Sequence, residues 1–362
     1  MMRFPLFCVA MVITAAAVTA QPVFAIHGEL IRLADVSLDS LATDADFDAN
    51  VLIIDVGSNL ADVEQERDQL EKIHDQAVRH KRKIGWWIEV ARCQSMADEH
   101  PQWMASLQGH GEWHRRFPKS AMAQAGEVVK VYPWVPIANQ PAFDAQLQRI
   151  QKLLQLLPAA DFIFLNDLQA APSACGCGND LCRWTTDYGP IKAGTPVGAD
   201  AAAKFCDAIQ ADHKASKVIP VWTTECEKVD GEPYGHCAGV GCFDGICWQA
   251  YTEQLMPVTD RHSIIGVQIL PKEFDRATAQ FDHGVTWVRS ALGSFQAMPP
   301  VRSGRAIAAN RLLPILQGWD TSPEQLQRQI IECERMGTSG YIIAKARIDQ
   351  SWTPQVVTVS RQ

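Results

Sequence analysis

The sequence predicts an α/β protein with the (β/α)₈ architecture, the TIM barrel, with long cysteine-rich loops after strands 2, 4 and 5. Short runs of β-branched and aromatic residues alternate with longer amphipathic runs along the 362 residues, as is typical of parallel βα units. Eight such units fit a barrel. No G-x-G-x-x-G motif follows the first run, which disfavours the alternative, an open doubly wound sheet that binds a dinucleotide.

The first half of the chain holds four strand candidates, which are bounded by turn residues and separated by amphipathic runs. The prolines of the third candidate, VVKVYPWVPI, place its far end in a loop. Strands are expected at 51–56, 83–90, 128–137 and 161–165, and helices at 61–81 and 143–157.

The second half continues the alternation. Ser322 as N-cap, Pro323 at the first helical position and Gln325 as the second half of a capping box predict a helix start, and Gly337 its end. Little chain follows the eighth strand, so residues 26–50 are expected to cover the place of the eighth helix. Strands are expected at 218–223, 264–270, 312–316 and 340–346, and helices at 201–213, 248–255 and 277–295.

The N-terminus has the pattern of a secretory signal peptide. A short basic segment that ends at Arg3 precedes an apolar run over 6–20, and Val23-Phe24-Ala25 fits a cleavage site, with cleavage after Ala20 as a second option. The apolar run is short for a membrane span, which needs ~20 residues. The expected domains are a signal peptide over 1–25 and one barrel over 26–362, exported to the periplasm or the extracellular space and without a membrane anchor after cleavage.

The charge balance limits the partners. The formal net charge is −8 and no Lys- or Arg-rich run occurs, which argues against nucleic-acid binding. Nothing in the sequence indicates the oligomeric state.

Ten cysteines follow the leader, and an even number in an exported protein favours disulfides. A structural zinc site made by Cys93, Cys175, Cys177 and Cys182 is the alternative, and it applies only if these residues are not disulfide-bonded. No cofactor is otherwise required. Four more cysteines share the loop after the fifth strand, and two lie in expected helices as buried or free thiols: Cys226, Cys237, Cys242 and Cys247, then Cys206 and Cys333.

Carboxylates recur where the expected strands end. In a barrel, the carboxyl ends of the strands carry the active site. A carboxylate there is costly unless it is paired or used, and Arg92, Lys272, Lys345 and Arg347 are candidate ion-pair partners. The acidic residues at or after the strand ends are Asp55, Glu89, Asp167, Glu225, Glu273, Asp320 and Asp349.

Tryptophans accompany these acids. The chain has 11 Trp and 5 Tyr, and indole rings stack on the apolar faces of sugars, although packing at the barrel rim would explain the same residues. The residues expected to bind a carbohydrate are Asn166, Trp87, Trp134, Trp222, Gln317, Trp319 and Asp320.

The pair Asn166-Asp167, followed by a loop with Cys175-x-Cys177-x₄-Cys182, resembles the clan-A glycoside hydrolases. In the β-galactosidase branch of that clan, an Asn-Glu pair ends strand four, and a nearby cysteine cluster binds structural zinc. The stretch 316–320 is also similar to uncharacterised exported glycosidase-like barrels. Two departures stand out, because the acid is Asp167 in place of Glu, and Gln317 and Asp320 occupy strand seven, where the clan keeps a glutamate nucleophile.

The sequence therefore predicts an exported glycoside hydrolase-like protein that acts on a carbohydrate through paired carboxylates. Asp167 as nucleophile or charge stabiliser and Glu225 as proton donor are the expected catalytic pair, with Glu89 in reserve; the arrangement is similar to the α-amylase type of barrel. A non-catalytic carbohydrate- or surface-binding barrel that has lost its strand-seven nucleophile is the alternative, so enzymatic activity is left open. No H-E-x-x-H motif supports a metal-dependent hydrolase.

Overall fold

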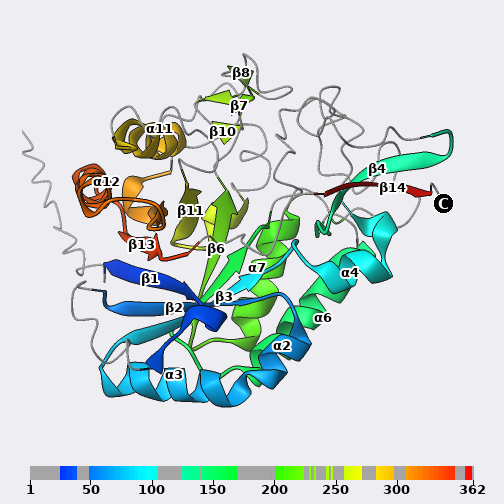
Figure 1. The fold of residues 1–362 in the computed structure, drawn as a ribbon, viewed down its shortest axis with the longest axis horizontal. Coiled ribbons are helices and arrows are strands. Elements are labelled where there is room, and N and C mark those ends of the chain that lie inside the picture. The colour runs from blue at the N-terminus through cyan, green and yellow to red at the C-terminus, as the bar shows by residue number, and fades with distance from the viewer. Residues whose placement is uncertain are drawn as a thin grey trace, which may run out of the picture.

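A computed structural model gives the fold, and it describes residues 25–38, 49–104, 124–137, 140–168, 197, 200–223, 228–229, 232–233, 242–243, 246–247, 257–270, 283–296, 307–346 and 355–360. Eight parallel strands form a closed barrel, which confirms the predicted architecture (Figure 1). Around the barrel they are β1 (Ile26–Arg32), β2 (Val51–Gly57), β3 (Lys83–Glu89), β5 (Phe162–Asn166), β6 (Lys217–Thr223), β11 (Ile265–Ile269), β12 (Leu312–Gln317) and β13 (Gly340–Ala344).

Amphipathic helices pack on the outside of the barrel, and most match their predicted ranges. The best match is α12, where Ser322 and Gln325 form the expected capping box and Gly337 ends the helix at φ 73°. The expected helix at 248–255 lies outside the described residues. The helices are α2 (Leu60–Gln65), α3 (Arg67–Arg79), α4 (Gln94–Glu99), α6 (Gln140–Leu156), α7 (Ala201–Asp212), α11 (Val285–Gln296) and α12 (Pro323–Met336).

The prediction that residues 128–137 form the third strand of the barrel was wrong. Within 128–137, β4 (Glu127–Tyr132) pairs antiparallel with β14 (Gln355–Ser360), and the two form a ribbon that projects from the side of the barrel (Figure 1). The β-branched pattern correctly indicated a strand. Its partner lies more than 220 residues further along the chain, from Gln355 paired with Tyr132 onward, and no local pattern reveals such a pairing.

The missing barrel strand is β1, in the segment that was expected only to cover a gap. It pairs in parallel with both β2 and β13 and so closes the barrel. Its pattern is hard to recognise because Glu29 interrupts the apolar run. Glu29 is 3% exposed and forms ion pairs with Arg82 at 2.9 Å and Lys345 at 3.0 Å, the second of which is among the predicted cation partners.

Closure at β1 depends on Gly340. This residue has φ 124°, and a Cβ atom there would collide with the backbone of Ile26. We expect Gly340→Ala to lower the free energy of unfolding by about 3 kcal/mol or more, because backbone strain adds to the clash. Urea unfolding checks this, with Gly293→Ala as the control, since no atom lies within 4 Å of a Cβ at Gly293. A loss equal to that of the control would contradict closure by this contact.

Side chains alternate between the barrel interior and the layer beneath the helices. Interior positions include Ile53, Phe164 and Ile315, which belong to one apolar cluster, whereas Ile54, Leu165 and Leu316 pack in the outer one. The alternation therefore fixes which strand-end residues face the mouth of the barrel.

Candidate functional site

A polar layer covers the apolar interior at the carboxyl ends of the strands. Each of its members lies two residues beyond an interior position, so the strand pleat points it into the barrel mouth. Four of the five are buried, and the fifth, Asp55, is half-buried. The layer consists of Asp55 on β2, Glu89 on β3, Asn166 on β5, Gln268 on β11 and Gln317 on β12.

Glu89 is the centre of this layer. One carboxylate oxygen accepts a hydrogen bond from the indole of Trp87 at 3.0 Å and pairs with Arg92 at 2.7 Å. The other oxygen accepts from the amide of Asn166 at 2.9 Å. The side chain is 5% exposed, so these partners replace water around a buried charge.

Gln268 extends the network to a third strand. Its amide donates to the side-chain oxygen of Asn166 at 2.5 Å, which leaves the Asn166 amide directed at Glu89. Sequence reasoning missed Gln268. The available signal was a single polar residue at an inward position of an otherwise apolar strand, IIGVQIL.

Asp167 joins the network from the residue after β5. It is 3% exposed, lies 3.4 Å from the Arg92 guanidinium, and has a left-handed backbone with φ 57°. Left-handed backbone at a non-glycine residue is strained and is frequent at functional sites.

Burial and the neighbouring groups act in opposite directions on Glu89. Burial opposes its ionisation, but the charge of Arg92 and hydrogen bonds from Asp167, Arg92 and Trp87 outweigh burial and lower the pKa of Glu89. Glu89 is therefore a buried carboxyl group that stays ionised.

Arg92 holds the pair together as a buried cation. Burial disfavours its charge, but Glu89 and Asp167 outweigh this and raise the pKa of Arg92, so the guanidinium stays charged. Arg92 was predicted as an ion-pair partner of the strand-end acids, and both contacts confirm that prediction.

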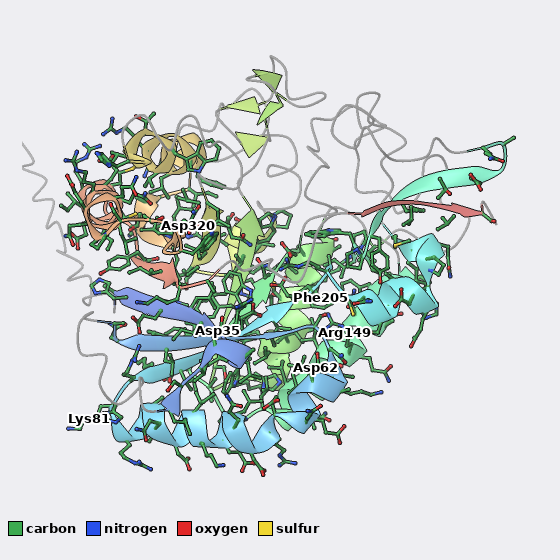
Figure 2. The ribbon with its side chains drawn as sticks, in the orientation of Figure 1. Asp35, Asp62, Lys81, Arg149, Phe205 and Asp320 are labelled. Carbon is green, nitrogen blue, oxygen red and sulfur yellow. The ribbon has the colours of Figure 1, made fainter. Side chains whose placement is uncertain are left out.

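A second arginine fixes the backbone around the site. Arg149 on α6 is 6% exposed and donates to the carbonyl oxygens of Ser58 at 2.6 Å, Glu89 at 2.8 Å and Val90 at 3.0 Å. It therefore ties the loop after β2 to the end of β3, and Figure 2 shows it between the helices and the strands. Sequence reasoning missed Arg149, because its carbonyl partners carry no sequence signal.

A cavity of about 460 Å³ opens beside Glu89, between the ends of β2 and β3 and the helices that follow them. It falls within the size range of small-molecule sites, roughly 300–1,000 Å³. Its lining is polar and includes Asp55, Asn59, Asp62, Glu89, Arg92 and Ser95. Burial and the charge of Glu89 raise the pKa of Asp55 to about 7, against the backbone N–H of Gly57 and the charges of Arg92 and Arg32.

The predicted carbohydrate-stacking tryptophans occupy different places. Trp87 faces the barrel interior and contacts Glu89, and Trp319 is half-buried against the interior cluster. Trp134 is 2% exposed and forms a backbone bridge with Arg92. Trp222 belongs to the outer core and is 1% exposed, so its ring cannot stack on a ligand in the barrel mouth.

The strand-seven candidates are only partly brought into the site. Gln317 is buried in the polar layer, and its amide donates to the carbonyl oxygen of Trp319 at 3.1 Å. Asp320 is exposed, with φ 49° (Figure 2). Glu225, Glu273 and Asp349 lie outside the described residues.

Of the four cysteines proposed as zinc ligands, only Cys93 is described. It is fully buried among Met96, Met104 and Val135, and its sulfur lies 3.4 Å from Ser95 Oγ. Cys175, Cys177 and Cys182 lie outside the described residues. Within the described ranges, no three His, Cys, Asp or Glu side chains are arranged to hold a metal ion, and no helix is long and apolar enough to cross a membrane.

Cys93, Cys206 and Cys333 are buried, unpaired thiols, which confirms the prediction for the two helical ones. Besides these three, seven cysteines follow residue 25, an odd number, so at least one of the seven cannot form an intramolecular disulfide. Cys242 and Cys247 are register partners in the β9–β10 pair (Cys242–Phe243 and Ile246–Cys247).

We expect thiol titration of the denatured, metal-free protein to find four free thiols: the three buried ones and one left unpaired by the odd count. Alkylation of the denatured protein should modify Cys93, Cys206 and Cys333, and mass spectrometry should identify them as alkylated. Finding any of these three in a disulfide would contradict the structure, and finding all ten free would remove the disulfides from the loops.

No protein-family model and no curated protein sequence matches this chain. Among solved structures, α-L-fucosidase isoenzyme 2 from Paenibacillus thiaminolyticus has 13% identity and a TM-score of 0.47, over 90% of this chain and 46% of that one. The chain thus spans about half the length of that enzyme. The β-mannanase from Streptomyces thermolilacinus has 11% identity and a TM-score of 0.39, over 88% and 78%.

A sugar phosphate isomerase/epimerase from Parabacteroides distasonis ATCC 8503 has 9% identity and a TM-score of 0.40, over 90% of this chain and 89% of that one. Similarity at this level does not indicate a substrate, and the barrel assignment rests on the closed sheet itself. The chain is a TIM barrel with distant structural similarity to glycoside hydrolases and to other barrel enzymes.

Proposed function

We propose that this protein is an exported carbohydrate-active enzyme that hydrolyses glycosidic bonds at the carboxyl mouth of its barrel. The observation that supports this most is the pair of buried carboxyl groups, Glu89 and Asp167, which lie 2.7 Å and 3.4 Å from the buried guanidinium of Arg92 at the barrel mouth. Glycoside hydrolysis needs one carboxylic acid that donates a proton and one ionised carboxylate.

Distance limits which groups can flank the scissile bond. The two catalytic carboxyl groups are ~5 Å apart in retaining enzymes and ~6.5–9.5 Å apart in inverting ones. Glu89 and Asp167 are in hydrogen-bond contact, too close to stand on opposite sides of a sugar. Glu89 is therefore proposed as a positioning residue that keeps the proton on Asp167, and the partner of Asp167 must come from another strand.

Glu225 is the proposed partner. It follows the end of β6 by two residues, and β6 neighbours β5, whose end precedes Asp167. We assign the proton donor to Asp167 and the ionised role to Glu225, which reverses the roles expected from the sequence. The reason is that Glu89 is ionised and shares the Arg92 guanidinium with Asp167, and a neighbouring negative charge favours a neutral carboxyl group. Asn166, Gln317 and Trp319 are proposed to contact the carbohydrate, whereas Trp87, which is 0% exposed, is proposed to position Glu89 through its hydrogen bond.

Export is proposed with removal of residues 1–25, and a structural zinc on the loop cysteines remains the alternative to disulfides there. The proposed roles of the carboxyl groups do not depend on export or on whether the loop cysteines bind zinc or form disulfides. A second candidate function is carbohydrate binding without catalysis, which is favoured by the absence of a glutamate at the end of β12, where Gln317 stands.

The deciding experiment offers the purified protein cello-, manno-, xylo-, fuco- and chito-oligosaccharides and aryl glycosides, and measures new reducing ends, released phenol and binding. Turnover of at least one glycoside supports the hydrolase. Binding without turnover favours the second candidate, and neither binding nor turnover with any carbohydrate overturns both.

A further inference from the structure

The cavity between the ends of β2 and β3 adjoins the proposed catalytic pair but is not used by it. Glu89 and Arg92 line the cavity and also contact Asp167, and Asp55 lines the cavity from β2, the strand that neighbours β3. A ligand that fills the cavity would therefore lie beside Glu89 and Arg92, the groups proposed to position Asp167.

The cavity walls are held in place before any ligand binds. Arg149 donates to the carbonyl oxygen of Ser58, and the side chain of Asn59 accepts from the backbone N–H of Ala61. The backbone N–H of Gly57 donates to Asp55 Oδ1 at 2.9 Å, which fixes the orientation of that carboxyl group. Because these groups are already ordered, little conformational entropy is lost when a ligand binds.

The lining is polar and suits a hydroxyl-rich ligand without negative charge. Ser58, Asn59, Gln94 and Ser95 supply neutral hydrogen-bonding groups, and Pro133 supplies an apolar contact. The ionisable groups of the lining are mostly acidic and disfavour an anionic ligand: Asp55, Asp62, Glu89 and Asp98, with Arg92. A hydrocarbon ligand would leave these groups without water or a partner. A sugar unit offers hydroxyl groups that both donate and accept.

Asp55 changes its protonation near neutral pH. Its surroundings include Glu89 and Arg92 from the β3 side, Arg32 from β1, Asp62 on α2 and Asp98 on α4. Burial, then Glu89, raises its pKa to about 7. An uncharged ligand that displaces water from the cavity would disfavour the ionised form further.

We propose that this cavity is a subsite for an uncharged sugar unit, and that Asp55 binds the sugar by donating a hydrogen bond from its neutral carboxyl group to a sugar hydroxyl. The inference rests on the proposed function only in taking the ligand to be a carbohydrate. It requires that the sugar binds with uptake of a proton by Asp55, and that its affinity falls as Asp55 ionises.

The test measures binding of cello-, manno-, xylo-, fuco- and chito-oligosaccharides by calorimetry, between about pH 5.5 and about pH 8.5, in buffers of different ionisation enthalpy. Asp167→Asn serves as the background that prevents turnover. We expect affinity to fall above about pH 7, by up to about tenfold per pH unit, with net proton uptake on binding. Asp55→Asn keeps the acceptor for Gly57 and a donor group but cannot ionise, so its affinity should be independent of pH over this range.

Two further variants complete the test. Asp55→Ala should weaken binding by about tenfold at the acidic end, the usual value of one hydrogen bond. Asp75→Asn, at a 73% exposed position on α3, should bind as the parent does. Proton release on binding, an unchanged pH dependence in Asp55→Asn, or no binding of any of these sugars would each overturn the subsite. Binding that behaves as expected in a protein without turnover would overturn the hydrolase alone.

Discussion

Replacing Arg92 with methionine should destabilise the protein by about 3–5 kcal/mol at neutral pH, the usual cost of removing one partner from a buried ion pair. Glu89 and Asp167 are 5% and 3% exposed, and each would lose its cation while remaining buried. Urea unfolding measures the effect. Arg328→Met, which breaks an exposed pair with Glu324 on α12, should cost under about 1 kcal/mol and serves as the control.

The pH dependence of the stability loss shows whether it comes from the lost ion pairs of Arg92. With Arg92 present, the pKa of Glu89 is lowered, so its ionisation contributes stability that is lost as pH falls through the folded-state pKa. Without Arg92, burial raises that pKa, and the unpaired charge destabilises the folded state more as pH rises. The cost of Arg92→Met should therefore shrink from about pH 7 to about pH 4.5, and Glu89→Gln should recover part of it. A loss that is independent of pH would mean that Arg92 stabilises only by packing.

The second large effect is on turnover. Asp167→Asn should lower turnover by about 10²–10⁴-fold, the usual contribution of a general acid, and Glu225→Gln by a similar or larger factor. If Asp167 donates the proton, its variant should retain most activity on aryl glycosides with acidic phenols, which depart without protonation. If Glu225 is the ionised group, its variant should be impaired on every substrate.

These variants also separate the two possible assignments. If aryl glycosides with good leaving groups restore turnover in Glu225→Gln but not in Asp167→Asn, Glu225 is the proton donor and Asp167 the ionised group, as expected from the sequence. Asp75→Asn is the matched control and should turn over as the parent does. Full activity in both variants would move the chemistry to other residues, first to Glu89.

Part of the site could be predicted because barrel geometry converts sequence position into location. Asp55 lies near the carboxyl end of β2 and Glu89 ends β3, so a fold prediction alone brings them to the same mouth. The direction of a side chain was harder to predict. Trp86 and Trp87 are adjacent, yet one packs beneath the helices and the other faces the barrel interior, and the pleat decides which. The same alternation turns Trp222 away from the mouth.

By itself, the sequence determined the barrel class, most strand and helix positions, and the carboxylates at the strand ends, because these follow from local periodicity and capping. Only the tertiary structure decided that β1 closes the barrel and that 128–137 pairs with the C-terminal strand, because strand pairing joins distant segments. It also decided that Glu89 and Asp167 meet at the guanidinium of Arg92, and that burial and the charge of Glu89 raise the pKa of Asp55 to about 7. Protonation depends on burial and on charges brought in from other strands, and these exist only once the chain has folded.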